Sequence, residues 1–314
     1  MDVNRLVESV PNFSEGRRDE VVDDIVAALA GAHPDVLVLD RSSDPDHNRS
    51  VLTLAGPPSA LAQAAVAGAR ACARLIDLTR HRGAHPRMGA LDVLPFVPLG
   101  ATTEDDCVAL AGQVGRRLVE EAGIPVYFYG AAARRPERAS LPQVRGKGFE
   151  ELREQATTDP ARAPDLGGPA LHPTAGATAV GVRPFLIAYN VDLASQDVEL
   201  AKRIAGAVRE RDGGLPAVRA LGFPLEERAM VQVSMNLVDY RLTPPAVAFA
   251  AVARLAEQAG VEVADSEIVG LVPQAALAGT DPAELRLRGF SSDQIVEERV
   301  RAALAERHER TRAR

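Results

Sequence analysis

The sequence of 314 residues contains no tryptophan and few other aromatic residues, with four tyrosines and eight phenylalanines. Proteins that bind single-stranded nucleic acids stack the bases on aromatic side chains and present a basic surface. This chain instead carries a formal net charge of −7. An acidic chain is also repelled by anionic membrane surfaces. We therefore expect neither a nucleic acid nor a membrane among its partners.

Cysteine and long apolar runs are equally scarce. The two cysteines, Cys72 and Cys107, fall on apolar positions of predicted helices, and no Cys-x-x-Cys pair occurs. This excludes a zinc ribbon and a disulfide framework, and it favours a reducing compartment. The first residues do not form a signal peptide, and no apolar run approaches the roughly 18 residues of a membrane-spanning helix. We expect a cytoplasmic protein.

Motifs of nucleotide-dependent or covalent chemistry are absent as well. No Gly-x-Gly-x-x-Gly follows a predicted strand, and there is no Gly-x-x-x-x-Gly-Lys-[Ser/Thr]. A nucleophile elbow and a Ser-x-x-Lys motif are also missing. The remaining chemistry is non-covalent, cofactor-free transfer or hydrolysis on an anionic small molecule, with a histidine as the acid/base.

Hydrophobic periodicity predicts alternating strands and helices along most of the chain. The predicted strands are residues 6–10, 36–39, 50–54, 91–97, 126–129, 185–191, 218–221, 231–237 and 267–272. The predicted helices are residues 21–29, 58–76, 103–123, 195–211, 244–260 and 291–308, with Ser14, Thr103, Ser195 and Ser291 as candidate N-caps. Residues 41–49 are predicted as a polar loop, 130–165 as a surface excursion, and 167–181 as a stiff glycine-rich loop.

Both halves of this pattern have the element order βαββαβ, which is the ferredoxin-like order. We predict an α+β fold of two ferredoxin-like α/β subdomains, residues 1–180 and 181–305, and a frayed tail over 306–314. Such sheets leave one face free, so the two sheets are expected to face each other across a substrate tunnel. A single doubly wound sheet fits less well, because no helix separates strands 36–39 and 50–54.

Two of the six histidines and three arginines lie within residues 80–87, between a predicted helix and a predicted strand. His81 and His85 have a spacing that suits metal ligands on a helix, but Gly83 and Pro86 disfavour a helix and no third ligand is evident. We therefore expect no metal. His81 is better explained as a residue that holds the loop. For His85, that role and general acid/base catalysis on an anionic substrate both stay open.

Two further segments allow either a structural or a functional interpretation. The polar cluster Asp44–Arg49 contains common turn formers, but it could also supply a carboxylate that orients a histidine or stabilises a cationic substrate group. The glycine-rich segment 167–181 either presents backbone N–H groups to a flat polar ligand or forms a plain interdomain turn. Residue chemistry alone leaves both pairs of alternatives open.

Four segments, in this order along the chain, resemble the glutamate formimidoyltransferase family. They are Val10–Gly16, residues 76–93 with the run His85-Pro86-Arg87-Met88-Gly89-Ala90-Leu91-Asp92-Val93, Pro125–Arg134, and Gly176–Asn190. The resemblance covers about residues 5–305. It implies two α/β subdomains facing a tunnel, usually in a homodimer. It also implies transfer of the formimidoyl group from N-formimidoyl-L-glutamate to tetrahydrofolate, which gives L-glutamate and 5-formimidoyltetrahydrofolate, a step of histidine degradation.

The resemblance assigns roles to particular residues. The family's catalytic histidine falls on His85, and its folate-contacting segment falls on Gly167–Gly176. An aspartate of the animal enzymes falls on Ser42, which has no carboxylate. We therefore expect Asp44 or Asp46 to stabilise the protonated amidine. One imidazole with an ordinary pKa of about 6.5 could take the proton of the attacking folate N5 and return it to the leaving glutamate amine.

Substrate binding is expected from arginines and from the glycine-rich segment. The arginines that would hold substrate carboxylates and the folate glutamate tail are Arg49, Arg82, Arg87 and Arg183. The binding residues expected in the glycine-rich segment are Gly167, Gly168, His172, Thr174, Gly176 and Thr178. Ala175 stands where the family has a tryptophan, so pterin stacking must differ. Tetrahydrofolate is implied as a co-substrate, and no metal is implied.

Three other functions remain possible on the sequence. One is formimidoyl transfer from another donor, such as formimidoylglycine. The second is a folate- or metabolite-binding module without turnover. The third is a metal-assisted amidine hydrolase. Since 314 residues leave no room for the cyclodeaminase half of the bifunctional relatives, we expect the product to pass to a separate cyclodeaminase.

Overall fold

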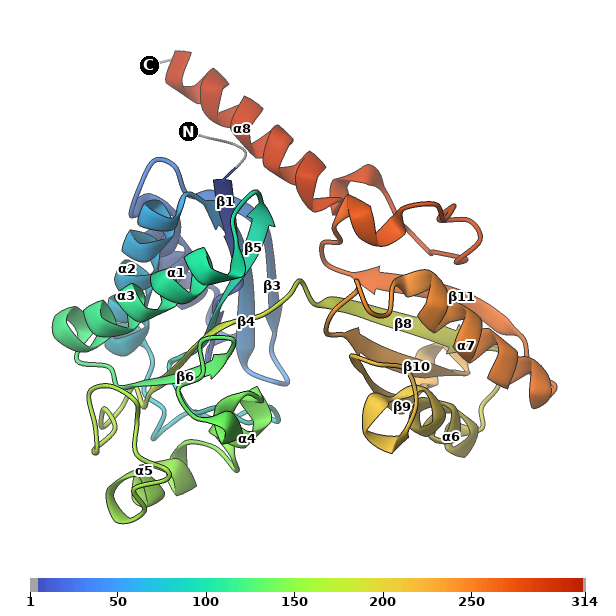
Figure 1. The fold of residues 1–314 in the computed structure, drawn as a ribbon, viewed down its shortest axis with the longest axis horizontal. Coiled ribbons are helices and arrows are strands. Elements are labelled where there is room, and N and C mark those ends of the chain that lie inside the picture. The colour runs from blue at the N-terminus through green and yellow to red at the C-terminus, as the bar shows by residue number, and fades with distance from the viewer. Residues whose placement is uncertain (1–4, 313–314) are drawn as a thin grey trace. The chain divides into compact units, whose positions relative to one another are not determined.

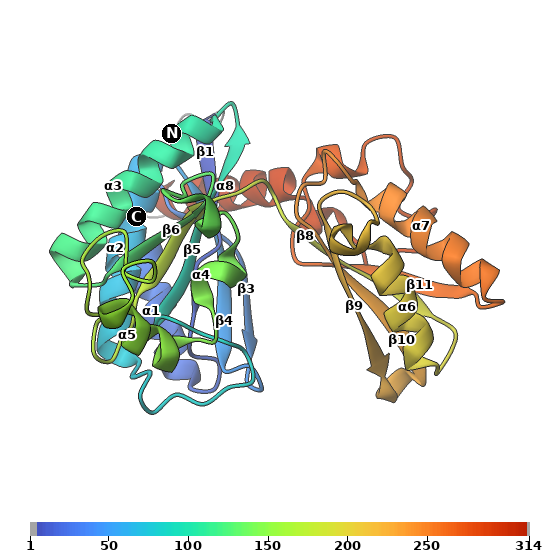
Figure 2. The ribbon, with the colours of Figure 1, turned by 60° about the horizontal axis from the view of Figure 1, so that its bottom comes forward.

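The computed structural model describes residues 5–312, and the chain forms two compact units, Met1–Arg183 and Pro184–Arg314. Each unit has a β-sheet with helices packed against it (Figures 1 and 2). This mixed composition confirms the predicted α+β fold class. The tunnel between the two sheets stays a prediction.

The first unit is built on a seven-stranded sheet. Its strands are β1 (Arg5–Ser9), β2 (Asn12–Phe13), β3 (Leu37–Asp44), β4 (Arg49–Gly56), β5 (Leu91–Gly100), β6 (Val126–Gly130) and β7 (Thr178–Val182). β1 and β2 act as one interrupted strand, because both pair antiparallel with β4 and with β5. With β3 beside β4, this gives the ferredoxin-like core β3–β4–β1/β2–β5. β7 and β6 extend it beyond β5 through parallel pairings.

Helices cover both faces of this sheet unequally. They are α1 (Asp19–Gly31), α2 (Pro58–Leu75), α3 (Glu104–Ala122), α4 (Leu141–Arg145) and α5 (Phe149–Thr158). The first three lie along the same side of the sheet in both ribbon views and contribute to the larger hydrophobic core (Figures 1 and 2). A smaller core joins α4 and α5 to the opposite face, where Val93 and Tyr129 contact Val144 and Leu152 in one cluster.

Local sequence signals explain where α3 begins and ends. The hydroxyl of Thr103 accepts a hydrogen bond from the N–H of Asp106, and the Asp106 carboxylate accepts one from the N–H of Thr103. This reciprocal cap satisfies N–H groups that have no partner within the helix. Gly123 ends the helix in the left-handed region, with φ 66°, a conformation that favours glycine. Both predicted ends of this helix are confirmed.

The second unit is a four-stranded sheet with two helices on one face. Its elements are β8 (Ile187–Leu193), α6 (Val198–Val208), β9 (Val218–Leu225), β10 (Met230–Leu237), α7 (Pro245–Gln258), β11 (Val263–Val269) and a final helix, α8 (Val296–Arg312). The strand order is β11–β8–β10–β9, and all neighbours are antiparallel. This order and the βαββαβ connectivity confirm the predicted ferredoxin-like arrangement.

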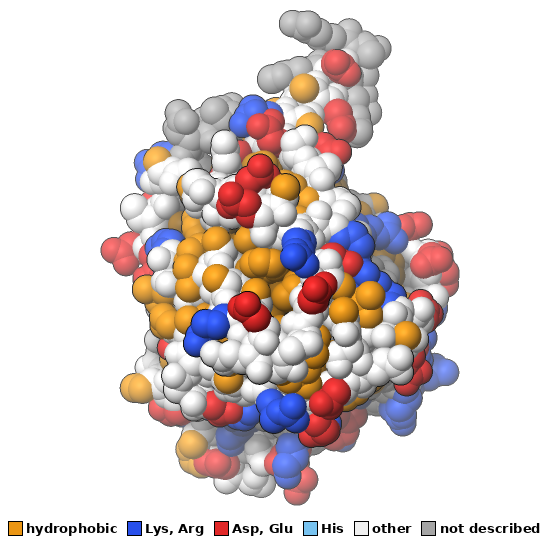
Figure 3. Space-filling model, turned by 90° about the vertical axis from the view of Figure 1, so that its right-hand side faces the viewer, with side chains coloured by type: hydrophobic (Ala, Val, Ile, Leu, Met, Phe, Trp, Pro, Cys, Tyr) orange, Lys and Arg blue, Asp and Glu red, His pale blue; other side chains and the backbone are white. Residues whose placement is uncertain are grey.

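Charged side chains link β8, β11 and the turn before β10 in the second unit. Arg228 pairs with Asp192 and Asp265, and Arg288 pairs with Asp265 over 3.0 Å and with Glu267 over 3.3 Å. Exposed large hydrophobic side chains also occur in this unit, at Leu221, Phe223, Leu242, Val247 and Val269. Figure 3 shows a face of the molecule on which hydrophobic side chains gather among single charged ones.

Two segments predicted as loops contain strands. Residues 41–44, predicted as part of a polar loop, continue β3, and a tight turn over 45–48 connects it to β4. Their polar side chains lie on an edge strand, where alternation of apolar residues is not required. The glycine-rich segment contains β7, which is buried between β5 and β6. Its Thr-Ala-Val-Gly-Val sequence is short and rich in small residues, so periodicity did not reveal it.

Several predicted helix ends are wrong. At α1 the Glu15 carboxylate accepts the N–H groups of residues 16–18, whereas the Ser14 hydroxyl donates to the carbonyl of Gly89. At α6 the cap is Asp197 instead of Ser195, and Ser291 makes no side-chain capping bond. Helix α8 continues to residue 312, and the fraying of 306–314 stays a prediction. Residues 313–314 lie outside the described part of the chain.

Candidate functional site

The histidine loop, residues 76–90, is held against the glycine-rich segment by backbone hydrogen bonds. Ala90 N–H donates to the carbonyl of Ala175, and Ala177 N–H donates to the carbonyl of Met88. Gly89 and Gly176 form a bridge between the two segments. Gly176 has φ 70°, and a Cβ there would clash with the Met88 carbonyl oxygen. The close approach of these two motifs therefore requires glycine at 176.

The predicted folate-binding residues form two groups, one near the histidine loop and one packed against α3 and Pro164. Thr174 and His172 lie near the histidine loop, since the Thr174 carbonyl accepts the Leu78 N–H and His172 bridges to Gly176. Thr178 is fully buried in β7, and its hydroxyl donates to the carbonyl of Leu91.

Gly167 and Gly168 lie elsewhere. They pack against Val119 of α3 and against Pro164. The family resemblance places them in the folate-contacting segment, and their part in folate binding stays a prediction.

His81 holds the loop, as predicted. It is 8% exposed, its Nδ1 accepts a hydrogen bond from Arg87 Nε over 3.1 Å, and its Nε2 lies 2.9 Å from the Asn48 carbonyl oxygen. The carbonyl oxygen can only accept a hydrogen bond, so Nε2 carries the proton. The arginine can only donate, so Nδ1 has no proton and the imidazole is neutral. Burial, aided by Arg87, lowers the pKa of His81. The Asn48 side chain in turn joins Gly16 N–H to the Arg82 carbonyl.

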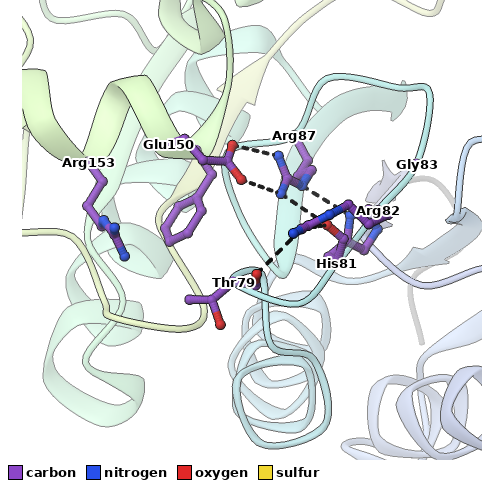
Figure 4. A pocket seen from close by; sticks show the side chains of 8 residues that line it. Thr79, His81, Arg82, Gly83, Arg87, Glu150 and Arg153 are labelled. Carbon is purple, nitrogen blue, oxygen red and sulfur yellow. Dashed lines mark hydrogen bonds and ion pairs between the residues drawn. The ribbon is translucent and has the colours of Figure 1, made fainter.

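Arg87 connects the histidine loop to α5. Its two terminal nitrogens donate to the two carboxylate oxygens of Glu150 over 2.7 and 2.8 Å (Figure 4). This pair stands at a cavity of about 370 Å³ lined by Thr79, His81, Arg82, Gly83, Arg87, Phe149, Glu150 and Arg153. Arg82 donates to the carbonyl of His81 within its own loop. Of the arginines predicted to bind substrate, Arg87 and Arg82 thus line one cavity.

His85 belongs to the same loop but is not among the residues that line this cavity. Its Nδ1 is 2.6 Å from the Pro86 carbonyl oxygen, so Nδ1 carries the proton and Nε2 remains as the acceptor. The His47 ring meets the His85 ring edge to face, with 5.8 Å between centroids. Burial, then Arg49 and Arg145, lower the pKa of His85 to about 4. The imidazole is therefore neutral at pH 7, which corrects the expected ordinary pKa.

The two predicted carboxylates have different surroundings. Asp44 Oδ2 lies 2.6 Å from His47 Nδ1, so Asp44 reaches His85 only through the His47 ring. Hydrogen bonds from the His47 N–H hold the pKa of Asp44 below its usual value. Asp46 meets the histidine loop through its backbone, since its carbonyl accepts the Ala84 N–H. Ser42 is an exposed residue of β3.

Asp92, which the sequence analysis did not select, organises the centre of the site. It is fully buried, and its Oδ2 accepts hydrogen bonds from Arg49 Nη1 over 2.7 Å and from Arg145 Nη2 over 2.8 Å. Its Oδ1 accepts the N–H groups of Met88 and Gly89. Burial alone would raise the pKa of Asp92, but the two guanidinium groups hold it below its usual value. Asp92 is therefore ionised and fixes both arginines and the histidine loop.

Residues from distant segments of the first unit are linked to the Asp92 carboxylate by hydrogen bonds. Arg49 also donates from Nε and Nη2 to Oδ1 of Asn12, over 3.1 and 3.0 Å. Arg145 comes from α4, in the segment predicted as a surface excursion. The signal that could have indicated Asp92 is a charged residue that interrupts an apolar strand, because a buried charge needs partners.

A second group of charges lies near the predicted residue Arg183. This arginine follows β7, and its N–H donates to the Phe96 carbonyl. It lowers the pKa values of Glu8 and Tyr129, which burial raises, and the pKa of Glu8 stays at about 7. Both Arg145 and Asp92 also act on Tyr129. Arg183 is thus electrostatically connected to the Asp92 cluster.

Two sequence expectations concern cysteines and metal ligands. Cys72 and Cys107 are free and buried, and burial raises the pKa of Cys107 to about 12. Among residues 5–312, no group of three or more His, Cys, Asp or Glu side chains is placed to hold a metal ion. No helix in that range is long and apolar enough to cross a membrane.

Comparison with known proteins covers nearly the whole chain. Residues 6–183 match the N-terminal subdomain of the formiminotransferase domain, and residues 188–304 match the formiminotransferase domain. The chain is 47% identical over 299 residues to a protein of Thermoplasma acidophilum named glutamate formimidoyltransferase, which spans 95% of this chain and 98% of that one.

Two further relatives extend the comparison. A protein of Streptococcus pyogenes with the same name is 42% identical over 294 residues, covering 93% of this chain and 98% of the other. The formimidoyltransferase-cyclodeaminase of Sus scrofa is 44% identical over 281 residues, which is 88% of this chain and 51% of that protein.

Proposed function

Because the chain belongs to the formiminotransferase family, we propose that it transfers the formimidoyl group from N-formimidoyl-L-glutamate to tetrahydrofolate. The products would be L-glutamate and 5-formimidoyltetrahydrofolate, as in histidine degradation. Two relatives that match this chain almost end to end are named glutamate formimidoyltransferase, which supports the choice of donor. The observation that carries the proposal is His85, a neutral imidazole whose Nε2 is its acceptor nitrogen, beside the largely buried guanidinium groups of Arg49 and Arg145.

The proposed reaction needs one proton carrier and no redox partner. Folate N5 attacks the amidine carbon, the new C–N bond forms, and the N5 proton passes to Nε2 of His85. The tetrahedral intermediate then collapses as the C–N bond to glutamate breaks. His85 returns its proton to the departing amine nitrogen, so the protein ends in its starting protonation state. Proton transfers of this kind contribute typically 10²- to 10⁴-fold to a rate.

The neutral form of His85 suits the first of these proton transfers. Only an imidazole without the second proton can accept one, and a pKa of about 4 keeps it in that form at pH 7. A base of such low pKa accepts protons weakly, so its basicity must rise when substrate binds. A bound anion near Arg49 and Arg145 would have this effect, because it offsets their positive charge.

The other predicted residues have supporting roles in the proposal. Asp44 would orient His47 against His85, and Asp46 would hold the turn against the histidine loop. Arg49 and Arg183 would contact substrate at the Asp92 cluster, whereas Arg82 and Arg87 would act at the 370 Å³ cavity. Thr174, Gly176 and Ala175 would border the pterin, since they lie against the histidine loop.

Two expectations about partners belong to the same proposal. The animal relatives join a formimidoyltransferase to a cyclodeaminase, so a separate cyclodeaminase is proposed as the consumer of the product. A homodimer is proposed from the family resemblance alone.

A single assay distinguishes the proposal from its rivals. The purified protein is incubated with each of two donors, N-formimidoyl-glutamate and N-formimidoyl-glycine, with and without tetrahydrofolate, and the products are identified by mass spectrometry. The proposal predicts 5-formimidoyltetrahydrofolate and free glutamate, only when both substrates are present. Release of glutamate without tetrahydrofolate would indicate a hydrolase. Preference for the glycine donor would change the substrate, and no turnover would indicate a binding module.

A further inference from the structure

Arg145 and Arg49 both donate to the carboxylate of Asp92, but they differ in how many of their side-chain nitrogens have a hydrogen-bond acceptor. All three side-chain nitrogens of Arg49 donate, to Asp92 and to Asn12. Arg145 donates to Asp92 through Nη2, and its Nε is buried without a hydrogen bond in the part of the chain that the structure describes. A buried donor without a partner is unfavourable, and a bound acceptor would satisfy it.

The charges around Arg145 do not balance. Asp92 is a single anion between two guanidinium groups, whose side chains are only 10% and 12% exposed. The other groups that act electrostatically within this cluster are His85, which is neutral at pH 7, Tyr129, and Arg183 with Glu8. An uncompensated positive charge in a buried site is costly, so the site favours a ligand that carries a negative charge.

We propose that Arg145 binds a carboxylate of the formimidoyl donor and thereby places the amidine carbon at His85. This inference rests on the proposed function. The planar guanidinium suits a carboxylate, because Nε and one terminal nitrogen can donate to its two oxygens together. Asp92 accepts a hydrogen bond from Nη2 of the same guanidinium and so fixes its orientation. Asp92 is thus the positioning residue, and Arg145 is the residue that contacts substrate.

Carboxylate binding at Arg145 would also change the basicity of His85. Arg145 is one of the two positive charges that lower the pKa of His85. A donor carboxylate would offset that charge, so the imidazole would become a better proton acceptor when the donor is bound. Donor recognition and proton transfer would then be linked through one side chain.

The test compares Arg145→Met, Arg145→Lys and the control Arg117→Gln, a surface arginine of α3 that pairs with Glu121. Donors are N-formimidoyl-glutamate and formamidine, which has the amidine but no carboxylate. Arg145→Met should raise KM for N-formimidoyl-glutamate by about 10- to 100-fold, since hydrogen bonds to charged groups have this strength. It should cause no comparable loss with formamidine, and Arg145→Lys should restore part of the loss with N-formimidoyl-glutamate.

Product binding provides a readout that does not need turnover. Calorimetry should show L-glutamate binding to the unaltered protein and to Arg117→Gln, and weaker binding by about tenfold or more to Arg145→Met. NMR should show that L-glutamate raises the pKa of His85 in the unaltered protein but not in Arg145→Met. An unchanged KM and an unchanged glutamate affinity in Arg145→Met would overturn the inference. An equal loss with formamidine would do so too, because it would indicate a structural role.

The inference and the proposed function can fail separately. If the unaltered protein transfers no formimidoyl group, the proposed function fails, while glutamate binding still decides the role of Arg145. If transfer occurs and Arg145→Met binds glutamate normally, the proposed function stands and the inference is wrong. Circular dichroism and thermal unfolding of each variant establish that the fold is intact, and Arg145→Lys serves where the methionine variant does not fold.

Discussion

Arg145 Nη2 donates to Oδ2 of Asp92 over 2.8 Å, although the two residues are 53 positions apart in the sequence. This contact attaches the short helix α4 to the start of β5, directly after the histidine loop. The same carboxylate also holds Arg49 and the N–H groups of Met88 and Gly89. One buried aspartate therefore determines the arrangement of the loop that carries His85.

Replacing Asp92 should affect stability and activity together. Asp92→Asn removes the carboxylate that Arg49 and Arg145 share, and breaking a buried ion pair costs about 3–5 kcal/mol. We expect a loss of this size in urea unfolding. The control Asp23→Asn removes an exposed pair with Arg41 and should cost at most about 1 kcal/mol. Equal losses in the two variants would contradict the role assigned to Asp92.

The approach of the glycine-rich segment to the histidine loop should depend on the absence of a side chain at Gly176. Gly176→Ala places a Cβ against the Met88 carbonyl and strains a residue with φ 70°, so we expect a loss of about 1–3 kcal/mol. Gly112→Ala, within α3 and free of close contacts, should instead stabilise by about 0.5–1 kcal/mol. Thermal unfolding of both variants measures the difference, and a destabilising Gly112→Ala with a neutral Gly176→Ala would refute it.

Glu8 should make the protein less stable as the pH rises. Burial raises its pKa from 4.5 to about 7, so the folded state binds a proton more tightly than the unfolded state. The resulting stabilisation is fully present below pH 4.5 and is lost as the pH rises through 7. Glu8→Gln mimics the protonated form and should be more stable than the unaltered protein at pH 8.5, by on the order of 2–3 kcal/mol. At pH 4 the two proteins should unfold alike, and a difference that does not change with pH would exclude this explanation.

The imidazole of His85 should titrate well below the usual range for histidine. Burial and the two neighbouring guanidinium groups lower its pKa to about 4, so NMR titration of the ligand-free protein should give a midpoint near that value. Arg145→Met removes one of the two charges and should move the midpoint upward. A midpoint near 6.5 in the ligand-free, unaltered protein would show that His85 is neither buried nor near these arginines in solution.

The sequence was informative where periodicity or spacing has one physical meaning. The order of strands and helices predicted both ferredoxin-like units, and the glycine and proline around His81 correctly argued against a helix there. It was uninformative where contacts form between distant segments. Asp92 lies in an apolar run whose pattern predicts only a buried strand. A buried charge needs partners, but the sequence does not show which residues they are. Arg145 lies in a segment whose helices are too short to show a period.

Loops were the other source of error. The polar residues 41–44 form an edge strand because β4 supplies their hydrogen bonds, which no local pattern reveals. Strand β7 is formed by parallel pairing with β5 and β6, and such pairing joins segments that are far apart in the sequence. The predicted carboxylates Asp44 and Asp46 were chosen because they are near Ser42 in sequence. Their role stays a prediction, and the structure adds a further carboxylate, Asp92, at the two arginines that lower the pKa of His85.

Formimidoyl transfer by His85→Ala, compared with His33→Ala, tests the central claim most directly. His33 lies after α1, where its Nδ1 accepts the Asp35 N–H, and it has no part in the proposed reaction. With both substrates saturating and the fold verified by thermal unfolding, His85→Ala should lower kcat by at least about 100-fold. His33→Ala should leave kcat unchanged. A kcat for His85→Ala within about tenfold of the unaltered protein would show that His85 does not carry the proton.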